Sequence, residues 1–221
     1  MRMLGPHASA SPAAAIMKTR DTENSDRRPA KSMSADPSTR PLKREGRAPV
    51  AAVGRFGAKG FGTLWLAWSD AGLVEVSFTP FEWLETVGVP TAAVPREYAE
   101  PLKAYFGGDA VELHGLPRDA RGTAFQHQVW EALCSIPRGS VRSYAGVASD
   151  IGNPRAMRAV GLANGRNPLP VVVPCHRVVA ASHQLGGYTG GLDRKRALLE
   201  LEGVRIEGDV VRPGQLTLFE G

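Results

Sequence analysis

The chain has 221 residues, of which 43% are hydrophobic and 22% charged, and its formal net charge at pH 7 is +5. This length allows one large or two small domains with a buried core, and the composition excludes a fibrous or wholly disordered protein. The two cysteines and five histidines show neither a disulfide framework nor metal-ligand spacing, so we expect no metal.

The sequence carries no signal for a membrane. No stretch approaches the run of about 18 apolar residues that spans a bilayer, and residues 8–16 are too short and alanine-rich for a secretory signal. Because two cysteines without a disulfide framework suit a reducing compartment, we expect a cytoplasmic protein. The pI of about 9.5 suits a polyanionic partner, although much of the positive charge lies in the first 50 residues.

Residues 1–48 are predicted to form a disordered leader. They mix Ala, Ser, Pro and charged residues without aromatic residues or a sustained period, so they cannot bury enough surface to offset their ordering entropy. Arg27-Arg28 and Lys43-Arg44 could touch nucleic acid, but a solvated tail is the simpler interpretation.

A first folded domain is predicted at residues 49–115. Residues 62–68 and 73–78 are apolar, partly alternating runs on either side of a Ser-Asp-Ala-Gly turn, which is typical of a β-hairpin. The apolar stripe of a helix follows, at Tyr98, Leu102, Tyr105 and Phe106. None of these residues has the pattern of a catalytic group, so we interpret the domain as a scaffold.

From Thr123 the pattern changes to helices and tight turns. Thr123 and Gln126 have the spacing of a capping box, which begins a helix. The apolar face of this helix is predicted to contain Phe125, Val129, Trp130, Leu133 and Cys134. Cys134 thus has a core position, and we assign it no chemistry.

Two short helical segments follow, at residues 143–151 and 154–164, with Gly152-Asn153-Pro154 at the break. Proline at the first helical position with asparagine before it is a helix start signal. Two helices joined by a short glycine-containing turn form a helix-turn-helix, whose second helix meets DNA, although many such motifs never bind DNA. Small residues together with Arg155 and Arg158 in the second segment favour close approach to a duplex.

Residues 171–179 place Cys175, His176 and Arg177 between two runs of valine. Burying a thiol, an imidazole and a guanidinium costs free energy, so we expect these groups to have a function. A base and a cation beside a cysteine lower its pKa from the free value of about 8.5 and favour the nucleophilic thiolate, which we expect at Cys175. The alternative is a buried structural cysteine next to a surface histidine.

Several segments resemble the O6-alkylguanine-DNA alkyltransferases, which are the methylated-DNA–protein-cysteine methyltransferases. The resemblance is continuous from about Thr123 to Gly203 and most specific at the proline-cysteine-histidine-arginine motif, whereas the first domain is similar only in length and outline. The leader has no counterpart. The segments that carry the resemblance are 143–144, 152–161, 167–168, 173–179, 186–192 and 195–203.

The resemblance implies DNA repair by direct alkyl transfer. An alkylated guanine flipped out of double-stranded DNA would enter a pocket under the helix-turn-helix, and the Cys175 thiolate would attack the alkyl carbon. The thioether would be permanent, so the protein, expected to be a monomer, would be consumed one for one without a cofactor or metal. Binding would be nearly independent of sequence, and activity on O4-alkylthymine is left open.

The resemblance also implies catalytic roles. His176 would take the thiol proton through a bridging water, and Glu202 would orient the imidazole, with Glu200 as the rival carboxylate. Tyr144, helped by Lys195, would protonate the departing guanine; the alternative for Tyr144 is a buried structural tyrosine.

Other matched positions are implied to bind DNA or line the pocket. Arg158 would enter the base stack in place of the flipped nucleotide, with a phosphate contact as the alternative. Asn167 would hold the hinge of the loop that leads to Cys175 by bonding the backbone. The remaining expected DNA contacts are Ser143, Asn153, Arg155 and Ala156, and the remaining pocket residues are Pro170, Val178, Gly186, Tyr188 and Thr189.

The expected fold class is α+β (α/β). A small strand-and-helix domain, ribonuclease H-like, at residues 49–115 would precede a mostly helical, winged-helix-like domain at residues 120–205 that carries the helix-turn-helix. Residues 206–221 would form a C-terminal tail.

Two other function classes remain open. A cysteine hydrolase could use the same cysteine, histidine and carboxylate, but it would need an oxyanion hole and would turn over. A DNA-binding, damage-sensing module would never react; Cys175 speaks against it, because nonreactive relatives replace the cysteine at this point of the motif.

Overall fold

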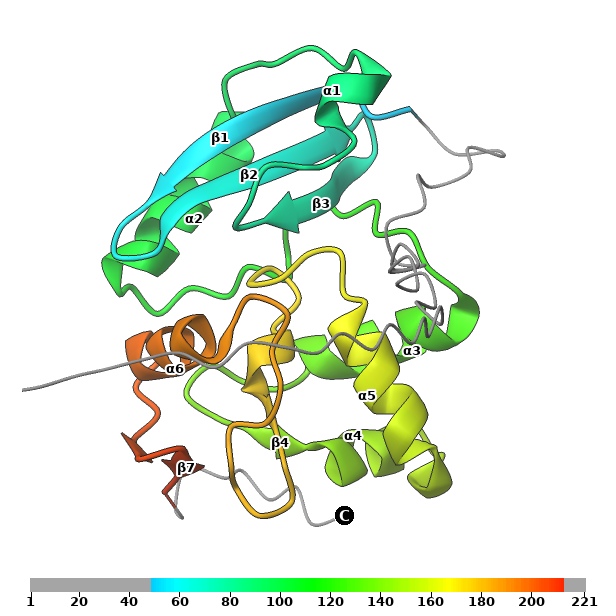
Figure 1. Ribbon diagram of the computed structural model, residues 1–221, viewed down its shortest axis with the longest axis vertical. Coiled ribbons are helices and arrows are strands. Elements are labelled where there is room, and N and C mark those ends of the chain that lie inside the picture. Colours follow the sequence, from blue (N-terminus) through cyan, green and yellow to red (C-terminus); the bar gives the residue numbers. More distant parts are fainter. Residues whose placement is uncertain (1–48, 213–221) are drawn as a thin grey trace, which may run out of the picture. The chain divides into compact units, whose positions relative to one another are not determined.

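The computed structural model describes residues 49–212. All of them belong to one of the two compact units into which the chain divides, Pro37–Gly221. The predicted leader at residues 1–48 and residues 213–221 of the predicted tail lie outside the described residues. The described part is a mixed α and β structure, as expected, with a small sheet followed by helices and two short strand pairs (Figure 1).

The first structural layer is an antiparallel sheet in the order β1-β2-β3. Its strands are β1 (Ala52–Ala58), β2 (Gly62–Ser69) and β3 (Gly72–Ser77). The predicted hairpin is confirmed. It needs glycine at position 72, where φ is 140° and a Cβ would lie 2.5 Å from the Pro117 backbone. β1 was not predicted, because glycines interrupt its alternating pattern.

One face of the sheet is covered by α2 (Arg96–Gly107), whereas α1 (Leu84–Val87) is a single turn near one end of the sheet (Figure 1). The predicted helical stripe is confirmed, since all four of its residues are buried. They share one face and pack in the main core: Tyr98, Leu102, Tyr105 and Phe106. The scaffold therefore depends on an amphipathic helix laid on a small sheet.

The helical half begins with α3 (Ala124–Cys134) at the predicted capping box. The Gln126 N–H donates to the Thr123 hydroxyl at 3.2 Å, and the Thr123 N–H donates to the Gln126 side chain at 2.8 Å. Trp130, buried on α3, donates from Nε1 to the Ala163 carbonyl at 2.9 Å. This bond ties α3 to the second helix of the helix-turn-helix.

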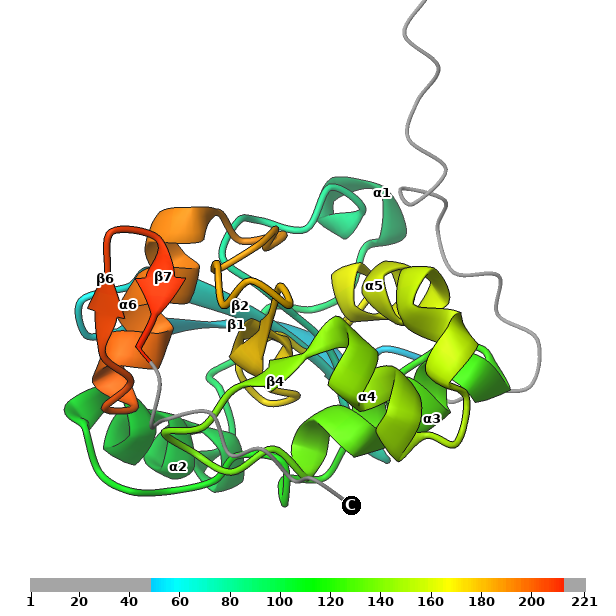
Figure 2. The ribbon, with the colours of Figure 1, turned by 90° about the horizontal axis from the view of Figure 1, so that it is seen from below.

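The helix-turn-helix is formed by α4 (Tyr144–Asp150) and α5 (Met157–Gly165), which pack side by side against α3 (Figure 2). The predicted start of the second helix is corrected in one respect. Residues Pro154–Ala156 form a turn of 3₁₀-helix, η2, and the Asn153 side chain makes no capping bond. Regular α-helix begins only at Met157.

Short elements complete the C-terminal half. Their bounds are β4 (Arg142–Ser143), η3 (Cys175–Arg177), β5 (Val178–Val179), α6 (Leu192–Leu201), β6 (Ile206–Glu207) and β7 (Val210–Val211). β4 and β5 pair in parallel, and β6 and β7 form an antiparallel hairpin. Because Val211 is fully buried, ordered structure continues past the domain boundary predicted at residue 205.

A single hydrophobic cluster includes residues from both halves, among them Leu66, Leu102, Trp130 and Val172. In addition, the Val76 N–H of β3 donates to the Pro168 carbonyl at 2.8 Å. The sheet thus supports the loop that leads to Cys175. The division at residues 115–120 stays a prediction. Within residues 49–212, no helix combines the length and apolar character needed to cross a bilayer.

Candidate active site

Cys175 lies on the single turn η3, between the two valine runs that surround it in the sequence. The residue is 4% exposed, His176 is fully buried and Arg177 is 2% exposed. The structure therefore excludes the alternative in which His176 is a surface residue. Burial of three adjacent polar groups requires partners for each of them, and these partners define the site.

The loop before Cys175 is tightly fixed. Asn167 donates from Nδ2 to the Val173 carbonyl at 2.8 Å, and its Oδ1 accepts the Leu169 N–H at 2.9 Å, as expected for a residue that bonds the backbone. Between these points, buried Val171 has a φ of 75°, a left-handed conformation that is unfavourable for a β-branched residue. Such strain persists only where the surroundings enforce it, so the path of the backbone into Cys175 is strongly determined.

The acidity of the thiol differs from the prediction. Burial raises the pKa of Cys175 to about 11, although contact with the Asn167 side chain and the charge of Lys195 act in the opposite direction. The expected lowering of the pKa is therefore wrong for the protein without DNA, because removal of the thiolate from water outweighs its neighbours. At pH 7 only about one molecule in ten thousand holds the thiolate, so a base is needed during the reaction.

A base is present in the buried pair of His176 and Glu202. The distance from His176 Nε2 to Glu202 Oε1 is 3.0 Å, and both side chains are fully buried. The rival Glu200 is exposed, so the choice of Glu202 as the partner is confirmed as a contact. Glu202 follows the last residue of α6, where its own N–H bonds carbonyls of the preceding turn.

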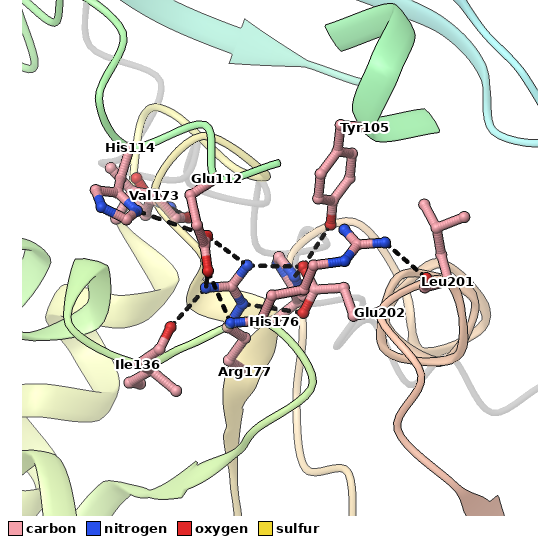
Figure 3. A network of polar contacts seen from close by, with 11 residues as sticks. Tyr105, Glu112, His114, Ile136, Val173, His176, Arg177, Leu201 and Glu202 are labelled. Carbon is pink, nitrogen blue, oxygen red and sulfur yellow. Dashed lines mark hydrogen bonds and ion pairs between the residues drawn. The ribbon is translucent and has the colours of Figure 1, made fainter. Parts of the chain in front are cut away.

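Glu202 is the centre of a larger polar network (Figure 3). Arg177 donates from Nε to Oε2 and from Nη2 to Oε1, both at 2.9 Å, and the Tyr105 hydroxyl donates to Oε1 at 2.6 Å. Burial opposes ionisation of this carboxyl, but His176 and Arg177 together lower its pKa far below the ordinary value. Glu202 is therefore an ionised, acceptor-only group.

This geometry sets the tautomer of His176. Since ionised Glu202 can only accept, the Nε2 of His176 carries the proton that bonds it, and in the neutral form of the ring the lone pair lies on Nδ1. Nδ1 is buried and makes no hydrogen bond within the described part of the chain. It is the atom through which His176 can accept a proton.

Lys195 is fully buried at the first turn of α6. Its Nζ donates to the carbonyls of Val178 at 2.6 Å, Leu185, and Gly187 at 3.4 Å. Burial lowers the pKa of Lys195 to about 8, while the charge of Cys175 acts in the opposite direction. Its acceptors in residues 49–212 are thus carbonyls of β5 and of the segment 185–191, which we call the pocket loop, not the Tyr144 hydroxyl that it was expected to assist.

Two tyrosines are coupled electrostatically to the thiol. Burial raises the pKa of Tyr144 and, more strongly, of Tyr188, and the charge that Cys175 carries as a thiolate acts in the same direction. The Tyr144 ring lies between two glycines: a Cβ on Gly161 of α5 or on Gly186 would be 3.9 or 3.8 Å from it. The Tyr188 hydroxyl is buried and makes no hydrogen bond to any described residue.

The other predicted pocket residues lie in β5, in the segment before η3 and in the segment after β5. Val178 is fully buried in β5, and Gly186 has a φ of 66°, a conformation that favours glycine. Pro170 is half-buried and forms a bridge with Val173. Thr189 is exposed, and its hydroxyl donates to the Gly165 carbonyl at the end of α5 at 3.1 Å.

The predicted DNA-binding residues lie on or near the helix-turn-helix. Asn153, Arg155 and Arg158 are exposed, whereas Ala156 is half-buried. Ser143 is the N-cap of α4, and its hydroxyl accepts the Gly146 N–H at 2.9 Å. Among the described residues, no group of three histidine, cysteine or acidic side chains could hold a metal ion.

Three network residues were missed from the sequence. Arg177 was noted but given no role, and Tyr105 and Glu112 were assigned to the scaffold. Glu112 accepts from Arg177 Nη2 at 2.9 Å and from the Arg138 backbone N–H at 2.8 Å. One feature of the sequence could have indicated a role for Arg177, namely its place in a motif flanked by valines. No feature of the sequence indicates a role for Tyr105, because the residue fits the apolar stripe of α2.

The chain is similar to known proteins in both sequence and structure. Residues 124–204 match a family model described as 6-O-methylguanine DNA methyltransferase, DNA binding domain. A Mycobacterium bovis protein named methylated-DNA–protein-cysteine methyltransferase is 47% identical over 150 residues, which cover 67% of this chain and 84% of that protein. A Methanosarcina barkeri protein of the same name is 44% identical over 149 residues, 64% of this chain and 90% of that protein.

Solved structures give the same result. The crystal structure of Mycobacterium tuberculosis O6-methylguanine methyltransferase matches with a TM-score of 0.63 and 43% identity over 72% of this chain and 96% of that chain. The M. tuberculosis OGT structure in complex with DNA matches with a TM-score of 0.61 and 43% identity, over 68% and 92% of the two chains. Both matches extend well beyond the helix-turn-helix.

The acidity of Cys175 predicts how it reacts with a small electrophile. In a Cys134→Ala protein, the rate of Cys175 carboxamidomethylation by iodoacetamide should rise about tenfold per pH unit from pH 7 to about 10, because only the thiolate reacts. Mass spectrometry of the labelled peptide gives the rate. When the same protein is unfolded in urea, the labelling rate should begin to level off near pH 9, the ordinary pKa of a cysteine. A plateau below about pH 8 in the folded protein would contradict the raised pKa.

The network also predicts how stability depends on pH. Glu202→Gln leaves buried Arg177 with only the partly exposed Glu112 as a charge partner, so the free energy of unfolding at pH 7 should fall by about 3 kcal/mol. Because the folded-state pKa of Glu202 is depressed, its contribution is present above the ordinary value of 4.5 and declines as the pH falls below it. Urea unfolding at a series of pH values should therefore show that the difference in unfolding free energy between Glu202→Gln and wild type becomes smaller in acid.

Glu200→Gln is the matched control, since Glu200 is an exposed carboxylate two residues away. We expect it to change stability by less than about 0.5 kcal/mol at every pH. Equal effects of the two substitutions would rule out the special role of Glu202.

Proposed function

Since this chain belongs to the methylated-DNA–protein-cysteine methyltransferase family, we propose that it repairs DNA by moving the alkyl group of an O6-alkylguanine to its own Cys175. The observation that supports this most directly is a buried thiol beside an ionised carboxylate–imidazole pair that leaves His176 Nδ1 able to accept a proton. The substrate is double-stranded DNA that contains the alkylated base, bound through the helix-turn-helix.

The first step is removal of the thiol proton. His176 Nδ1 accepts the proton from Cys175 through a bridging water, and the imidazolium so formed is stabilised by ionised Glu202. The thiolate attacks the alkyl carbon in line; a sulfur–carbon bond forms as the carbon–oxygen bond to guanine breaks. Water cannot hydrolyse the resulting thioether, so each molecule reacts once.

Guanine must take a proton as it leaves. Tyr144 is the donor in this account, since its raised pKa keeps the phenol protonated near neutral pH and its ring lies between α5 and the pocket loop. Tyr144 regains its proton, and His176 loses the one it accepted, by exchange with solvent, so the proton lost by the thiol balances the proton gained by guanine. Lys195 acts by holding the pocket loop to β5 through three carbonyls, which refines its expected role as a direct helper of Tyr144.

The flipped base is received by a pocket whose walls include Tyr188, Pro170, Val178 and Thr189. The hydroxyl of Tyr188 is buried and has no hydrogen-bond partner among residues 49–212, so it is suited to bond a polar edge of the base. Gly186 lets the chain pass close to a flat ring, and Asn167 fixes the loop between α5 and Cys175.

The exposed face of the helix-turn-helix is the proposed DNA surface. Arg158 enters the base stack where the nucleotide has left, and base flipping requires that the unstacked space be filled or its energy otherwise offset. The other proposed contacts are to the backbone and are largely independent of sequence: Ser143, Asn153, Arg155 and Ala156.

We extend the proposal to the finer architecture. The three-stranded antiparallel sheet with α2 supports a ribonuclease H-like first domain at residues 49–115, and the strand pairs around the helix-turn-helix support a winged-helix-like domain at residues 120–205. The protein acts as a monomer, because one chain holds every group of the reaction. A thiol that must stay reduced favours a reducing compartment such as the cytoplasm.

The reaction predicts a single, stoichiometric mass change. After mixing with duplex DNA containing O6-methylguanine, the intact protein should gain the mass of one methylene, located on the peptide that carries Cys175, at one equivalent per molecule. Cys175→Ala should bind the duplex with unchanged affinity and gain no mass. Repeated turnover of an ester or peptide panel would favour a cysteine hydrolase, and binding without any mass gain by the wild type would favour a sensing module.

Substitution of two arginines on the DNA surface should distinguish an effect on base flipping from an effect on DNA affinity. Arg158→Ala is expected to slow methyl transfer at saturating duplex by about tenfold or more, because the flipped state loses its support. Arg155→Ala should instead weaken DNA affinity and its salt dependence while leaving the transfer rate at saturation unchanged. If both variants only weaken affinity, Arg158 is a phosphate contact.

A further inference from the structure

The buried Glu202 carboxylate receives a hydrogen bond from a part of the chain far from the catalytic motif. Tyr105 lies on α2, 97 residues before Glu202, and its hydroxyl donates to Oε1 at 2.6 Å. The same oxygen is the partner of His176 Nε2 at 3.0 Å. Tyr105 points from α2 toward this carboxylate (Figure 3). Two groups that share one oxygen atom cannot be positioned independently.

A second contact from the same part of the chain fixes Arg177. Glu112, between α2 and α3, accepts from Arg177 Nη2 at 2.9 Å and from Nη1 at 3.3 Å. Arg177 in turn holds both oxygens of Glu202. The carboxylate is therefore oriented by Tyr105 directly and by Glu112 through the guanidinium.

Arg138 joins these contacts together. Its guanidinium lies over the Tyr105 ring at 5.0 Å and donates to the Leu201 carbonyl, one residue before Glu202, at 2.8 Å. Its backbone N–H also donates to Glu112 at 2.8 Å. The ring of Tyr105 is thus packed against a side chain that also holds the end of α6, and rotation of the ring away from Glu202 is opposed.

We propose that Tyr105 is a positioning residue for the Cys175 reaction, acting through Glu202 and His176, and that Glu112 has the same role through Arg177. The inference rests on the proposed function. Tyr105 does not touch the substrate; it fixes the oxygen that holds the imidazole, and so fixes the direction in which Nδ1 presents its lone pair. The residues before α3 then contribute to the rate of transfer as well as to stability.

The role of positioning residue has a consequence that a purely structural role lacks. Without the Tyr105 hydroxyl, Glu202 retains Arg177 and His176, so the carboxylate stays ionised but has more rotational freedom. Orientation of the base weakens, whereas the DNA surface on α5 is untouched. Loss of the Tyr105 hydroxyl should therefore lower the rate of transfer and leave the affinity for DNA unchanged.

Tyr105→Phe tests the proposal, because it removes one hydroxyl and keeps the ring. In single-turnover reactions with O6-methylguanine duplex, the transfer rate at saturation should fall about tenfold, as expected for loss of one hydrogen bond to a charged group. The dissociation constant for the duplex should be unchanged. The rate of Cys175 carboxamidomethylation by iodoacetamide should be unchanged, because it depends on the thiolate fraction at the bulk pH and not on an oriented base.

The matched control is Tyr98→Phe, a buried tyrosine on the same helix that makes no hydrogen bond to Glu202. It should transfer at the wild-type rate. A folded Tyr105→Phe protein with the wild-type rate, or an equal loss in both variants, would overturn the proposal. A wild-type protein that captures no methyl group would instead refute the proposed function, so the two failures are distinguishable.

Glu112→Gln provides a second, independent variant, since its side chain is partly exposed and its replacement does not open the core. It should lower the saturated transfer rate by a few-fold without changing DNA affinity. Should Tyr105→Phe fail to fold, a wild-type rate in Glu112→Gln would overturn the proposal, and a selective loss of rate would support it.

Discussion

The site depends on one ionised carboxylate that has been removed from water. An isolated buried charge is too unfavourable to persist, so Glu202 remains ionised because a guanidinium and an imidazole bond it, while a phenol donates a further hydrogen bond. These partners come from different parts of the chain, and the carboxylate brings them into one fixed arrangement. Positioning of His176, burial of Arg177 and contact with α2 all follow from the need to satisfy this one group.

Burial has the opposite outcome for the Cys175 thiol, which it keeps in the neutral form. Cys175 is surrounded by apolar residues and its pKa is raised to about 11, so the protein without DNA holds an almost entirely protonated cysteine. Reactivity must therefore be produced when the substrate is bound, by transfer of the proton to His176. A thiol of this kind reacts slowly with stray electrophiles. That property suits a protein that is used once, because a premature reaction would inactivate it.

Much of this organisation could be predicted from the sequence. Local signals were sufficient for the hairpin, for α2 and α3, and for the helix-turn-helix, since alternation, apolar stripes and capping residues act over a few positions. The partnership of His176 and Glu202 followed from family resemblance, not from any local signal. The first turn of the second helix was misjudged, because proline and asparagine mark a helix start but do not decide between 3₁₀ and α geometry.

The remaining errors share a physical cause, which is that burial depends on the whole fold. The neighbours of Cys175 in the sequence indicated a lowered pKa, but desolvation is set by residues packed around it from elsewhere. Tyr105 looked like one more apolar residue of an amphipathic helix, and nothing local indicates that its hydroxyl meets Glu202. Long-range polar contacts of this kind become visible only when the chain is folded.

The ionisation of Glu202 is the central claim, and it can be measured directly. Carbon-13 NMR of protein labelled at glutamate side-chain carboxyls, with the Glu202 signal assigned by its loss in Glu202→Gln, follows this group through an acid titration. The account predicts that the Glu202 signal stays at the ionised position down to about pH 3.5 or to the onset of unfolding, while exposed glutamates titrate normally. A Glu202 titration centred near 4.5, the ordinary value, would contradict it.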